Sequence, residues 1–330
     1  MLIDFGTPES VMNCNILDYM EIALIDGLYE PPIALDLFTK AARANALHGS
    51  ALVAKSRMAS SATKLSKQLS RSHYNRFLAD YLTFGNGYLL AVRNAFGEII
   101  SFKHLPALFM RRAENIERYT YKPNEFNDDG RIDYAKGQVF HLAEYDASQE
   151  IYGLPQYIGA LTSIWLNEDA TVFRRCYYRN GSHAGYLLYM NDASITPEQE
   201  EYIRKTLEKS AGLGAFKNLF INGKGNNGKA PELTPIGQVE AKDAFKDVKN
   251  MTTNDILASH RIPLDLMSVV REGFSSSNDL NKVDRIFYKN ELTPLLESVC
   301  ELNDFAGSEV VSIKPYTALD ATESDNKNKK

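Results

Sequence analysis

Cysteine is scarce in this chain, which holds three cysteines among 330 residues. Cys14, Cys176 and Cys300 are odd in number and far apart, so they fit neither a zinc site nor a disulfide framework. Nowhere do about 18 apolar residues follow one another, and the start Met1–Phe5 lacks the basic segment of a secretory signal. We therefore expect no membrane span and a protein made in a cytoplasm.

A catalytic constellation is also missing. The six histidines are scattered and contain no pair at the helical i, i+4 spacing that suits zinc. No nucleophile-elbow pattern accompanies the serines. His260, just before Arg261 and Pro263, is expected to be a helix C-terminal residue stabilised by the helix dipole. The sequence therefore predicts no enzyme, with no catalytic residue, cofactor or metal site.

Positive charge is limited, because 37 lysines and arginines face 42 acidic residues and leave a formal net charge of −5. A protein that grips nucleic acid by neutralising phosphates usually concentrates lysine and arginine on one surface. This composition disfavours such a protein.

The chain does contain one clear long helix, expected from Pro155 to Gly181. Pro155 suits a first helical turn, Gly181 suits the left-handed residue that ends a helix, and basic residues in the last turn complement the dipole. Its apolar positions form one stripe, with Cys176 as a small core residue. These positions are Ile158, Leu161, Ile164, Trp165, Val172, Phe173 and Cys176.

Several short runs around this helix are collinear with a known family. They are Tyr152–Pro155, Trp165–Ala170, Phe173–Arg175, Tyr177–Tyr178, Asn180–Gly185, and, elsewhere, Asp18–Tyr19, Leu28–Pro32, Phe84–Tyr88, Val139–Leu142, Phe216–Phe220 and Ala258–Pro263. The series resembles the portal proteins of tailed bacteriophages, specifically the PBSX-type branch of temperate contractile-tailed phages. No single run is diagnostic, and the ordered series over nearly the whole chain carries the resemblance.

The resemblance implies a phage portal fold of the α+β class with a reduced crown. Its parts would be an N-terminal α+β wing (1–150), a first stem helix (151–183), a small α/β clip (184–236), a second stem helix (237–262), a tunnel loop (263–277), a long kinked helix returning to the wing or crown (278–314) and a disordered tail (315–330).

The sequence pattern of residues 1–150 also predicts an α+β fold. Apolar periodicity and breakers predict helices first and short strands after Gly87. The helices are expected at 35–44, 51–65 and 73–82, and the strands at 88–92, 99–102, 118–121 and 138–142.

The clip region is expected to alternate strands and a helix. Thr196 and Gln199 have the spacing of a capping box for a helix that reaches about Ser210. Strands are expected at 184–190 and 216–222, followed by an extended 231–235 and a helix at 242–260. The apolar side of that last helix would hold Phe245, Val248, Met251 and Ile256.

Gly223–Ala230 fits most of a phosphate-binding P-loop. Such a loop needs a hydroxyl where this chain has Ala230, and a following helix where it has Pro231 and Pro235. A surface hairpin turn is favoured, with its lysines meeting an acidic partner or phosphates. A P-loop-like nucleotide-dependent enzyme stays as the alternative, beside a non-viral helical scaffold protein.

The long C-terminal helix from Asn278 contains Pro294, which removes one intrahelical bond and clashes with the carbonyl of Asn290. We expect a kink at Pro294, or two helices joined there.

By resemblance, three sets of residues form the sites. The tunnel loop facing DNA holds Met267, Ser268, Val269, Val270, Arg271, Glu272, Gly273, Phe274 and Ser275. The clip surface that docks terminase holds Lys217, Lys224 and Lys229, and the stem helix holds Trp165, Phe173, Arg174 and Arg175.

The resemblance implies a portal vertex subunit of the virion, assembled in the host cytoplasm into a closed ring of about twelve copies. Double-stranded DNA would pass through it without sequence readout. The implied partners are the terminase large subunit, which supplies the energy, the major capsid and scaffolding proteins, and the head-completion or tail connector proteins.

Overall fold

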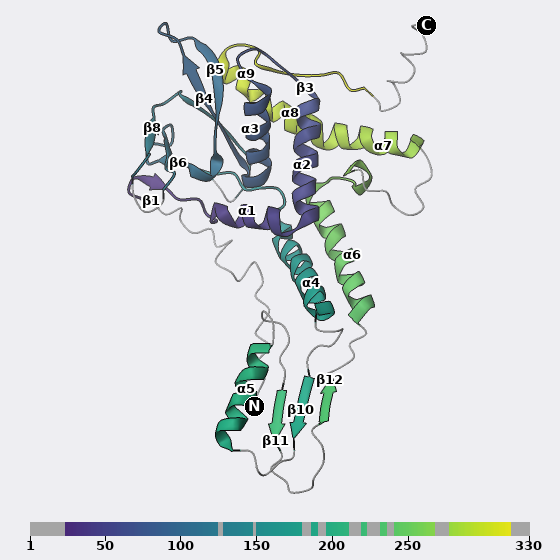
Figure 1. Ribbon diagram of the computed structural model, residues 1–330. Coiled ribbons are helices and arrows are strands. Elements are labelled where there is room, and N and C mark those ends of the chain that lie inside the picture. The colour runs from purple at the N-terminus through teal and green to yellow at the C-terminus, as the bar shows by residue number, and fades with distance from the viewer. Residues whose placement is uncertain are drawn as a thin grey trace. The chain divides into compact units, whose positions relative to one another are not determined.

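The structure is a computed structural model, and two compact units make up the chain. The first unit combines residues 1–164 with 254–330, and the second spans residues 165–253 (Figure 1). The structure describes residues 24–124, 128–147, 150–179, 186–190, 196–210, 219–222, 232–235, 241–267 and 277–317. Among these residues no helix is long and apolar enough to cross a membrane.

A three-stranded antiparallel sheet lies in the first unit, in the order β5-β4-β9. The strands are β4 (Asn86–Arg93), β5 (Ile99–Leu105) and β9 (Val139–Ala143). The strands expected at 88–92, 99–102 and 138–142 are confirmed.

Three helices pack beside this sheet: α1 (Leu35–Ala44), α2 (Ala46–Ser61) and α3 (Arg71–Phe84). Ser70 caps α3 by accepting from the His73 N–H. Gly85 ends α3 in the left-handed conformation, and a Cβ there would lie 2.5 Å from the Leu154 carbonyl carbon. Glycine is therefore required at this helix end.

The helix expected at 51–65 is displaced. Asn45 starts α2 earlier, because its side chain accepts from the backbone N–H groups of Leu47 and His48. At the other end, residues 63–65 form strand β3, which pairs with β13 (Val311–Ile313). By pairing with β13, the backbone N–H and C=O groups of residues 63–65 gain hydrogen-bond partners that the end of an isolated helix would lack.

The core of the first unit lies between α3, the sheet and the C-terminal helices. Tyr74, Phe77 and Leu78 of α3 are fully buried, at the i, i+3, i+4 spacing of one helix face. Leu296 and Leu302 enter the same cluster from α8 (Thr293–Val299) and α9 (Glu301–Ala306).

A second, five-stranded sheet completes this unit, in the order β1-β2-β6-β7-β8. Its strands are Leu24–Ile25, Leu28–Tyr29, Met110–Ala113, Tyr119–Tyr121 and Ile132–Tyr134. A 3₁₀ turn, η1 (Ala107–Phe109), joins β5 to this sheet.

Pro294 lies where two helical segments join, which is one of the two alternatives predicted, and a π-helical turn precedes it. α7 (Ser277–Phe287) continues into η4 (Tyr288–Leu292), where the Thr293 N–H bonds to the Tyr288 carbonyl, and then into α8. The wider turn ends just before Pro294, which stands in the first turn of α8, where its missing N–H costs little.

The second unit holds the α/β segment expected between two helices. Strand β10 (Tyr186–Met190) pairs in parallel with β11 (Leu219–Asn222) and antiparallel with β12 (Glu232–Pro235). A parallel pair needs a crossover, and α5 (Pro197–Ser210) provides it.

The capping box of α5 is confirmed. The Thr196 N–H bonds to Gln199 Oε1 at 3.1 Å, and the Gln199 N–H bonds to Thr196 Oγ1 at 3.4 Å. The residues of the expected P-loop-like turn, 223–231, lie outside the described residues.

Candidate functional site

Two long antiparallel helices are the most prominent candidate functional elements. They are α4 (Leu161–Arg179) and α6 (Ala241–His260). The α6 prediction is confirmed, whereas α4 begins later than Pro155. Residues 158–160 form a 3₁₀ turn (η2), held by the Ile158 N–H on the Pro155 carbonyl, so the proline precedes the helix and does not start it.

The contacts between α4 and α6 are polar. In the second unit, Asn167 Nδ2 donates to Thr252 Oγ1 at 2.7 Å and both side chains are buried, while Lys249 Nζ donates to Thr171 Oγ1 at 2.9 Å. In the first unit, Ser163 Oγ donates to Asp255 Oδ2 at 3.0 Å. We call these three pairs the polar seam.

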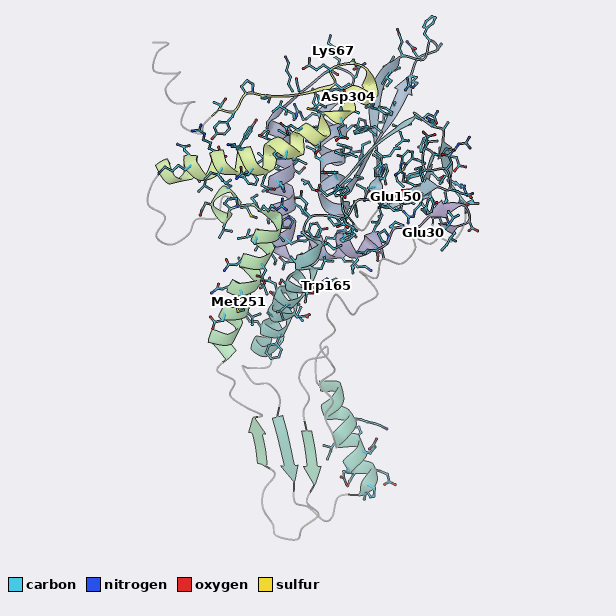
Figure 2. All side chains as sticks on the ribbon, turned by 180° about the vertical axis from the view of Figure 1, so that it is seen from behind. Glu30, Lys67, Glu150, Trp165, Met251 and Asp304 are labelled. Carbon is cyan, nitrogen blue, oxygen red and sulfur yellow. The ribbon has the colours of Figure 1, made fainter. Side chains whose placement is uncertain are left out.

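Apolar side chains of the same helices face solvent in the single chain. Leu166 and Val172 of α4 are each 48% exposed, and Met251 of α6 is 68% exposed. Figure 2 labels Met251 and Trp165, and Trp165 is half-buried. The single apolar stripe expected on α4 is therefore buried at Leu161 and Ile164 and open further along. Met251 is likewise not on a buried side of α6.

The predicted stem residues differ in exposure. Phe173 is half-buried, and Arg174 and Arg175 are exposed. Burial, and then the Arg174 charge, lower the pKa of Lys249. Among the described residues no carboxylate forms an ion pair with either arginine. Arg174, Arg175 and Lys249 thus bring three cations to this end of the helix pair.

Of the nine residues expected to face DNA in the tunnel loop, Met267 is the one that the structure describes. It ends the short 3₁₀ turn η3 (Leu264–Met267) and packs against the core of the first unit. Ser268–Ser275 and the three clip lysines, Lys217, Lys224 and Lys229, lie outside the described residues. The roles of all these residues stay predictions.

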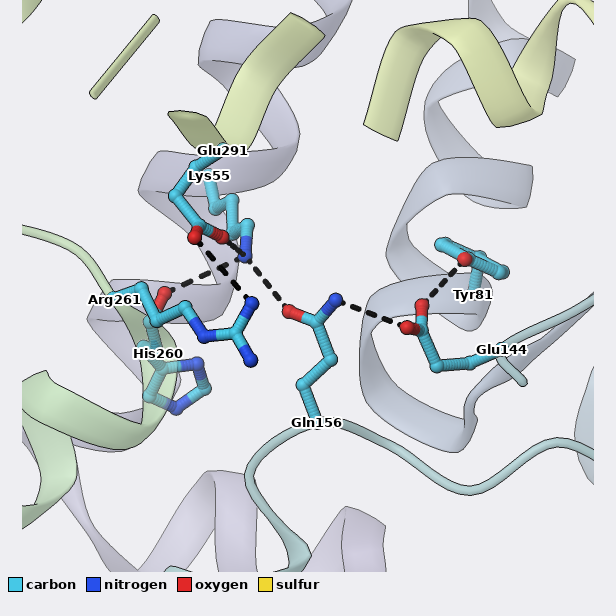
Figure 3. Close-up of polar contacts among 7 residues, drawn as sticks. All are labelled: Lys55, Tyr81, Glu144, Gln156, His260, Arg261 and Glu291. Carbon is cyan, nitrogen blue, oxygen red and sulfur yellow. Dashed lines mark hydrogen bonds and ion pairs between the residues drawn. The ribbon is translucent and has the colours of Figure 1, made fainter. Parts of the chain in front are cut away.

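A buried polar cluster lies at the end of α6, and we call it the Lys55 network (Figure 3). Lys55 is 3% exposed, and its Nζ lies 3.2 Å from Glu291 Oε2, 3.1 Å from Gln156 Oε1 and 3.4 Å from the His260 carbonyl. Burial lowers the pKa of Lys55, and the Glu291 charge opposes that effect. Lys55 thus ties α2, the 156 loop, the end of α6 and the π turn together.

The network extends on both sides of Lys55. Gln156 Nε2 donates to Glu144 Oε1 at 3.0 Å, and the Tyr81 hydroxyl donates to the other Glu144 oxygen at 2.5 Å. Burial raises the pKa of Tyr81, and the Glu144 hydrogen bond raises it further. On the other side Arg261 reaches Glu291 at 3.4 Å.

Arg261 has an unusual backbone. Its φ of 53° lies in the left-handed region that favours glycine. The Ile262 N–H bonds to the Leu257 carbonyl and the Arg261 N–H to the Ala258 carbonyl, which is the Schellman ending of α6. An arginine in this position is strained, and its ion pair with Glu291 offsets part of that cost.

His48 and His260 form a buried pair in the same cluster, with 2.7 Å between His48 Nδ1 and His260 Nε2. Burial lowers the pKa of His48 to about 4 and that of His260 to about 3. Both rings are therefore neutral at pH 7. His260 is the C-terminal residue of α6, as predicted, and burial lowers its pKa.

The tautomer of the pair follows from an unpartnered atom. His48 Nε2 is buried without a hydrogen-bond partner. An unpaired acceptor costs less than an unpaired N–H, so His48 Nδ1–H donates to His260 Nε2.

Reasoning from sequence missed the Lys55 network. One signal was available: Lys55 follows Ala51 and Leu52 at helical spacing on the buried face of α2. A lysine there requires a buried partner. The partner, Glu291, is 236 residues away and no local pattern points to it. Among the described residues no group of three or more metal-ligating side chains occurs.

The comparisons with known proteins agree with one another. The sequence profile described as "Phage portal protein" matches residues 65–306. The chain is 38% identical over 314 residues to the "Probable portal protein" of Escherichia phage P2, covering 95% of this chain and 90% of that protein. It is 32% identical to the "Probable portal protein" of Haemophilus phage HP1, covering 86% and 84%.

Solved structures show the same fold. The neck of an empty gene transfer agent particle aligns with a TM-score of 0.63 at 15% identity, covering 95% of this chain and 92% of that chain. An HK97 family phage portal protein from Corynebacterium diphtheriae aligns with a TM-score of 0.56 at 12% identity, covering 86% and 95%. No match names the PBSX-type branch, so that finer assignment stays a prediction.

Proposed function

Because this chain belongs to the phage portal protein family, we propose that it acts as one subunit of a closed ring at the portal vertex of a virion. The ring is the channel through which the genome enters the capsid and leaves at infection. The fold is the α+β portal fold.

The main observation in favour of a ring is that α4 and α6 contact each other through polar side chains and leave apolar side chains exposed. The polar seam uses the polar side chains within one chain, and Leu166, Val172 and Met251 stay exposed. Exposing these apolar side chains to water is unfavourable for a single subunit. Neighbouring subunits in a ring bury them in heterologous contacts, which stabilises the assembly.

The finer assignments are part of this proposal. About twelve copies form the ring. The solved neck of a native gene transfer agent particle was computed with C12 symmetry, which supports that number by analogy. Residues 151–183 and 237–262 act as stem helices, 184–236 as the clip that meets the terminase large subunit and then the tail connector, and 263–277 as the tunnel loop. Capsid and scaffolding proteins meet the wing, and assembly takes place in the host cytoplasm.

The test is the mass of the assembly. We expect native mass measurement of the purified chain at micromolar concentration to show a closed ring, and Leu166→Asp with Val172→Asp to reduce rings to monomers while far-ultraviolet circular dichroism stays unchanged. Leu166→Met with Val172→Ile is the matched control and should form rings. A wild type that stays monomeric or dimeric contradicts the ring.

The nucleotide-dependent enzyme is not favoured, because the family match and the fold both place the chain among portal proteins. We expect no saturable ATP binding by the wild type and none by Lys229→Ala, measured by isothermal titration calorimetry. ATP binding that Lys229→Ala abolishes would restore the enzyme alternative.

A further inference from the structure

Basic and acidic residues are concentrated in separate segments of this chain, which the net charge of −5 does not reveal. Residues 37–79 contain eight lysines and arginines and no aspartate or glutamate. Residues 290–313 contain five acidic residues and no lysine or arginine. The first segment covers most of α1, all of α2 and β3 and the first part of α3, and the second covers the end of η4, α8, α9 and β13.

The basic segment lines a groove. A groove of about 700 Å³ runs between α2 and α3, with Leu52, Val53 and Ala79 along it and a rim of Arg57, Arg71 and Lys314. All three rim cations are exposed, and no carboxylate lines the groove. Among the described residues none of these three forms an ion pair. We call it the basic groove.

Two of the three rim cations, Arg71 and Lys314, are held in place without being neutralised. Arg71 donates to the Ser60 and Thr63 carbonyls at 2.6 and 3.1 Å, and Lys314 Nζ donates to the Ser61 carbonyl at 2.7 Å. Carbonyl oxygens orient a cation but leave its net charge available. The groove is therefore a preorganised site for an anionic partner.

The acidic segment presents a complementary face on two consecutive helices. Glu297, Glu301 and Asp304 follow i, i+4, i+7 spacing on α8 and α9 and are all exposed. Among the described residues none of the three is in an ion pair. We call this the acidic face.

The basic groove and the acidic face lie on opposite sides of the first unit. In Figure 1, α2 and α3 stand in front of α8 and α9, and in Figure 2, seen from behind, α8 and α9 stand in front. The apolar sides of all four helices meet in the core between them. The two charged surfaces therefore point away from each other, and one chain cannot bring them together.

We propose that the basic groove of one subunit receives the acidic face of the next subunit around the ring. A closed ring needs two different, complementary surfaces on opposite sides of each subunit, and this unit carries such a pair. Opposite charges fix the register of docking and reject the same face of another copy. The inference rests on the proposed ring and adds the surfaces that form it.

Double-stranded DNA is the other polyanion that the groove could meet. Three rim cations neutralise few phosphates, and apolar side chains along the groove suit a protein surface better than a sugar-phosphate backbone. A second copy of the chain is the occupant that these observations favour.

Complementary charge reversal tests the contact. Variant A combines Arg57→Glu with Lys314→Glu, and variant B combines Glu301→Lys with Asp304→Lys. Arg71 is left unchanged because it braces the end of α2. In each variant alone, like charges face each other at every contact, and we expect at least about tenfold fewer rings in native mass spectra.

An equal mixture of variants A and B is the most specific test of the contact between the basic groove and the acidic face. Every contact between an A and a B subunit joins opposite charges, so the mixture should form rings in which A and B alternate. Such rings contain equal and even numbers of the two variants, which their masses resolve. The matched control is Arg118→Glu with Lys136→Glu, which changes the charge equally at exposed positions elsewhere and should form rings alone.

Three results would overturn the pairing. Variants A and B could each form rings as the wild type does, the mixture could fail to restore rings while the wild type forms them, or A could form normal rings and lose affinity for DNA. The last result would assign the groove to DNA. A wild type that forms no ring would instead refute the proposed function, so the two failures are distinguishable.

Discussion

Individual buried polar residues hold the end of α6 in place, and Lys55 is the central one. Its ammonium has a carboxylate, an amide oxygen and a carbonyl within hydrogen-bond distance. Losing the carboxylate would leave a buried cation with neutral partners only, which is costly because few waters can reach it.

We expect Glu291→Leu to lower the free energy of unfolding of the first unit by about 3 kcal/mol. The double variant Lys55→Met with Glu291→Leu should lose clearly less, because it removes the unpaired charge. Urea unfolding followed by circular dichroism measures both. Equal losses in the single and double variants would show that Lys55 does not depend on Glu291.

The buried histidine pair makes stability depend on pH. Both rings have a lowered pKa in the folded chain, about 4 for His48 and about 3 for His260, against 6.5 in an unfolded chain. Below about pH 6.5 the two histidines bind protons in the unfolded state but stay neutral in the folded state. The free energy of unfolding therefore falls as the pH decreases towards 4.

We expect the urea midpoint to fall between pH 7 and pH 4 more steeply in the wild type than in a variant with His48→Gln and His260→Gln. Each histidine contributes up to about 1.4 kcal/mol per pH unit in this range. The carboxylates are the same in both proteins, so the difference isolates the pair. Parallel curves would mean that the histidines do not titrate differently on unfolding.

At the scale of elements, the polar seam decides how α4 and α6 meet. Asn167 has its amide on Thr252, whose own hydroxyl donates to the Val248 carbonyl at 2.7 Å. A chain of this kind orients the helices more specifically than apolar contacts do, because each donor needs one acceptor.

Thr252→Val keeps the shape of the side chain and leaves the Asn167 amide buried without a partner. We expect a loss of about 1 to 3 kcal/mol in the stability of the second unit. The control is Asn167→Leu with Thr252→Val, which removes both polar groups and should recover part of the loss. Hydrogen exchange of α4 amides measures the change locally.

The two prolines differ in how well local patterns predict them. Two helical segments joined at Pro294 were one of the predicted alternatives, but the π turn before the proline was not predicted. Pro155 was expected to start a helix, and in the structure it lies in a loop next to Gly85. Helix periodicity and helix capping depend on neighbouring residues, so the capping box of Thr196 and Gln199 could be predicted from the sequence. The surroundings of the two prolines and the Lys55–Glu291 pair depend on contacts between residues far apart in the chain. The spacing of residues in the sequence does not predict such contacts.

At the scale of the whole molecule, the collinear runs along the sequence led to the family and to the α+β fold, and the comparisons confirm both. The expected stem residues Trp165, Phe173, Arg174 and Arg175 are placed on α4. Their roles, and those of the tunnel loop and clip residues, stay predictions.

The tunnel loop assignment can be tested in assembled particles. Deleting Val270–Ser275 should leave the number of subunits in the ring unchanged, because α4 and α6 are intact, and should impair completion or retention of packaged DNA. The readout is the DNA content of purified particles. Arg271→Ala alone should weaken DNA contact slightly and alter no sequence preference. Particles that package and keep full genomes would contradict the assignment.

The pairing of β3 with β13 joins residues 63–65 to residues 311–313. On the ribosome, the first of these strands emerges long before the second, and the whole second unit is made in between. Lys314, on the rim of the basic groove, and the acidic helices come from the same late segment. A nascent chain exposes neither finished surface until this late segment has emerged and folded. Assembly of the ring therefore has to follow the folding of the late segment.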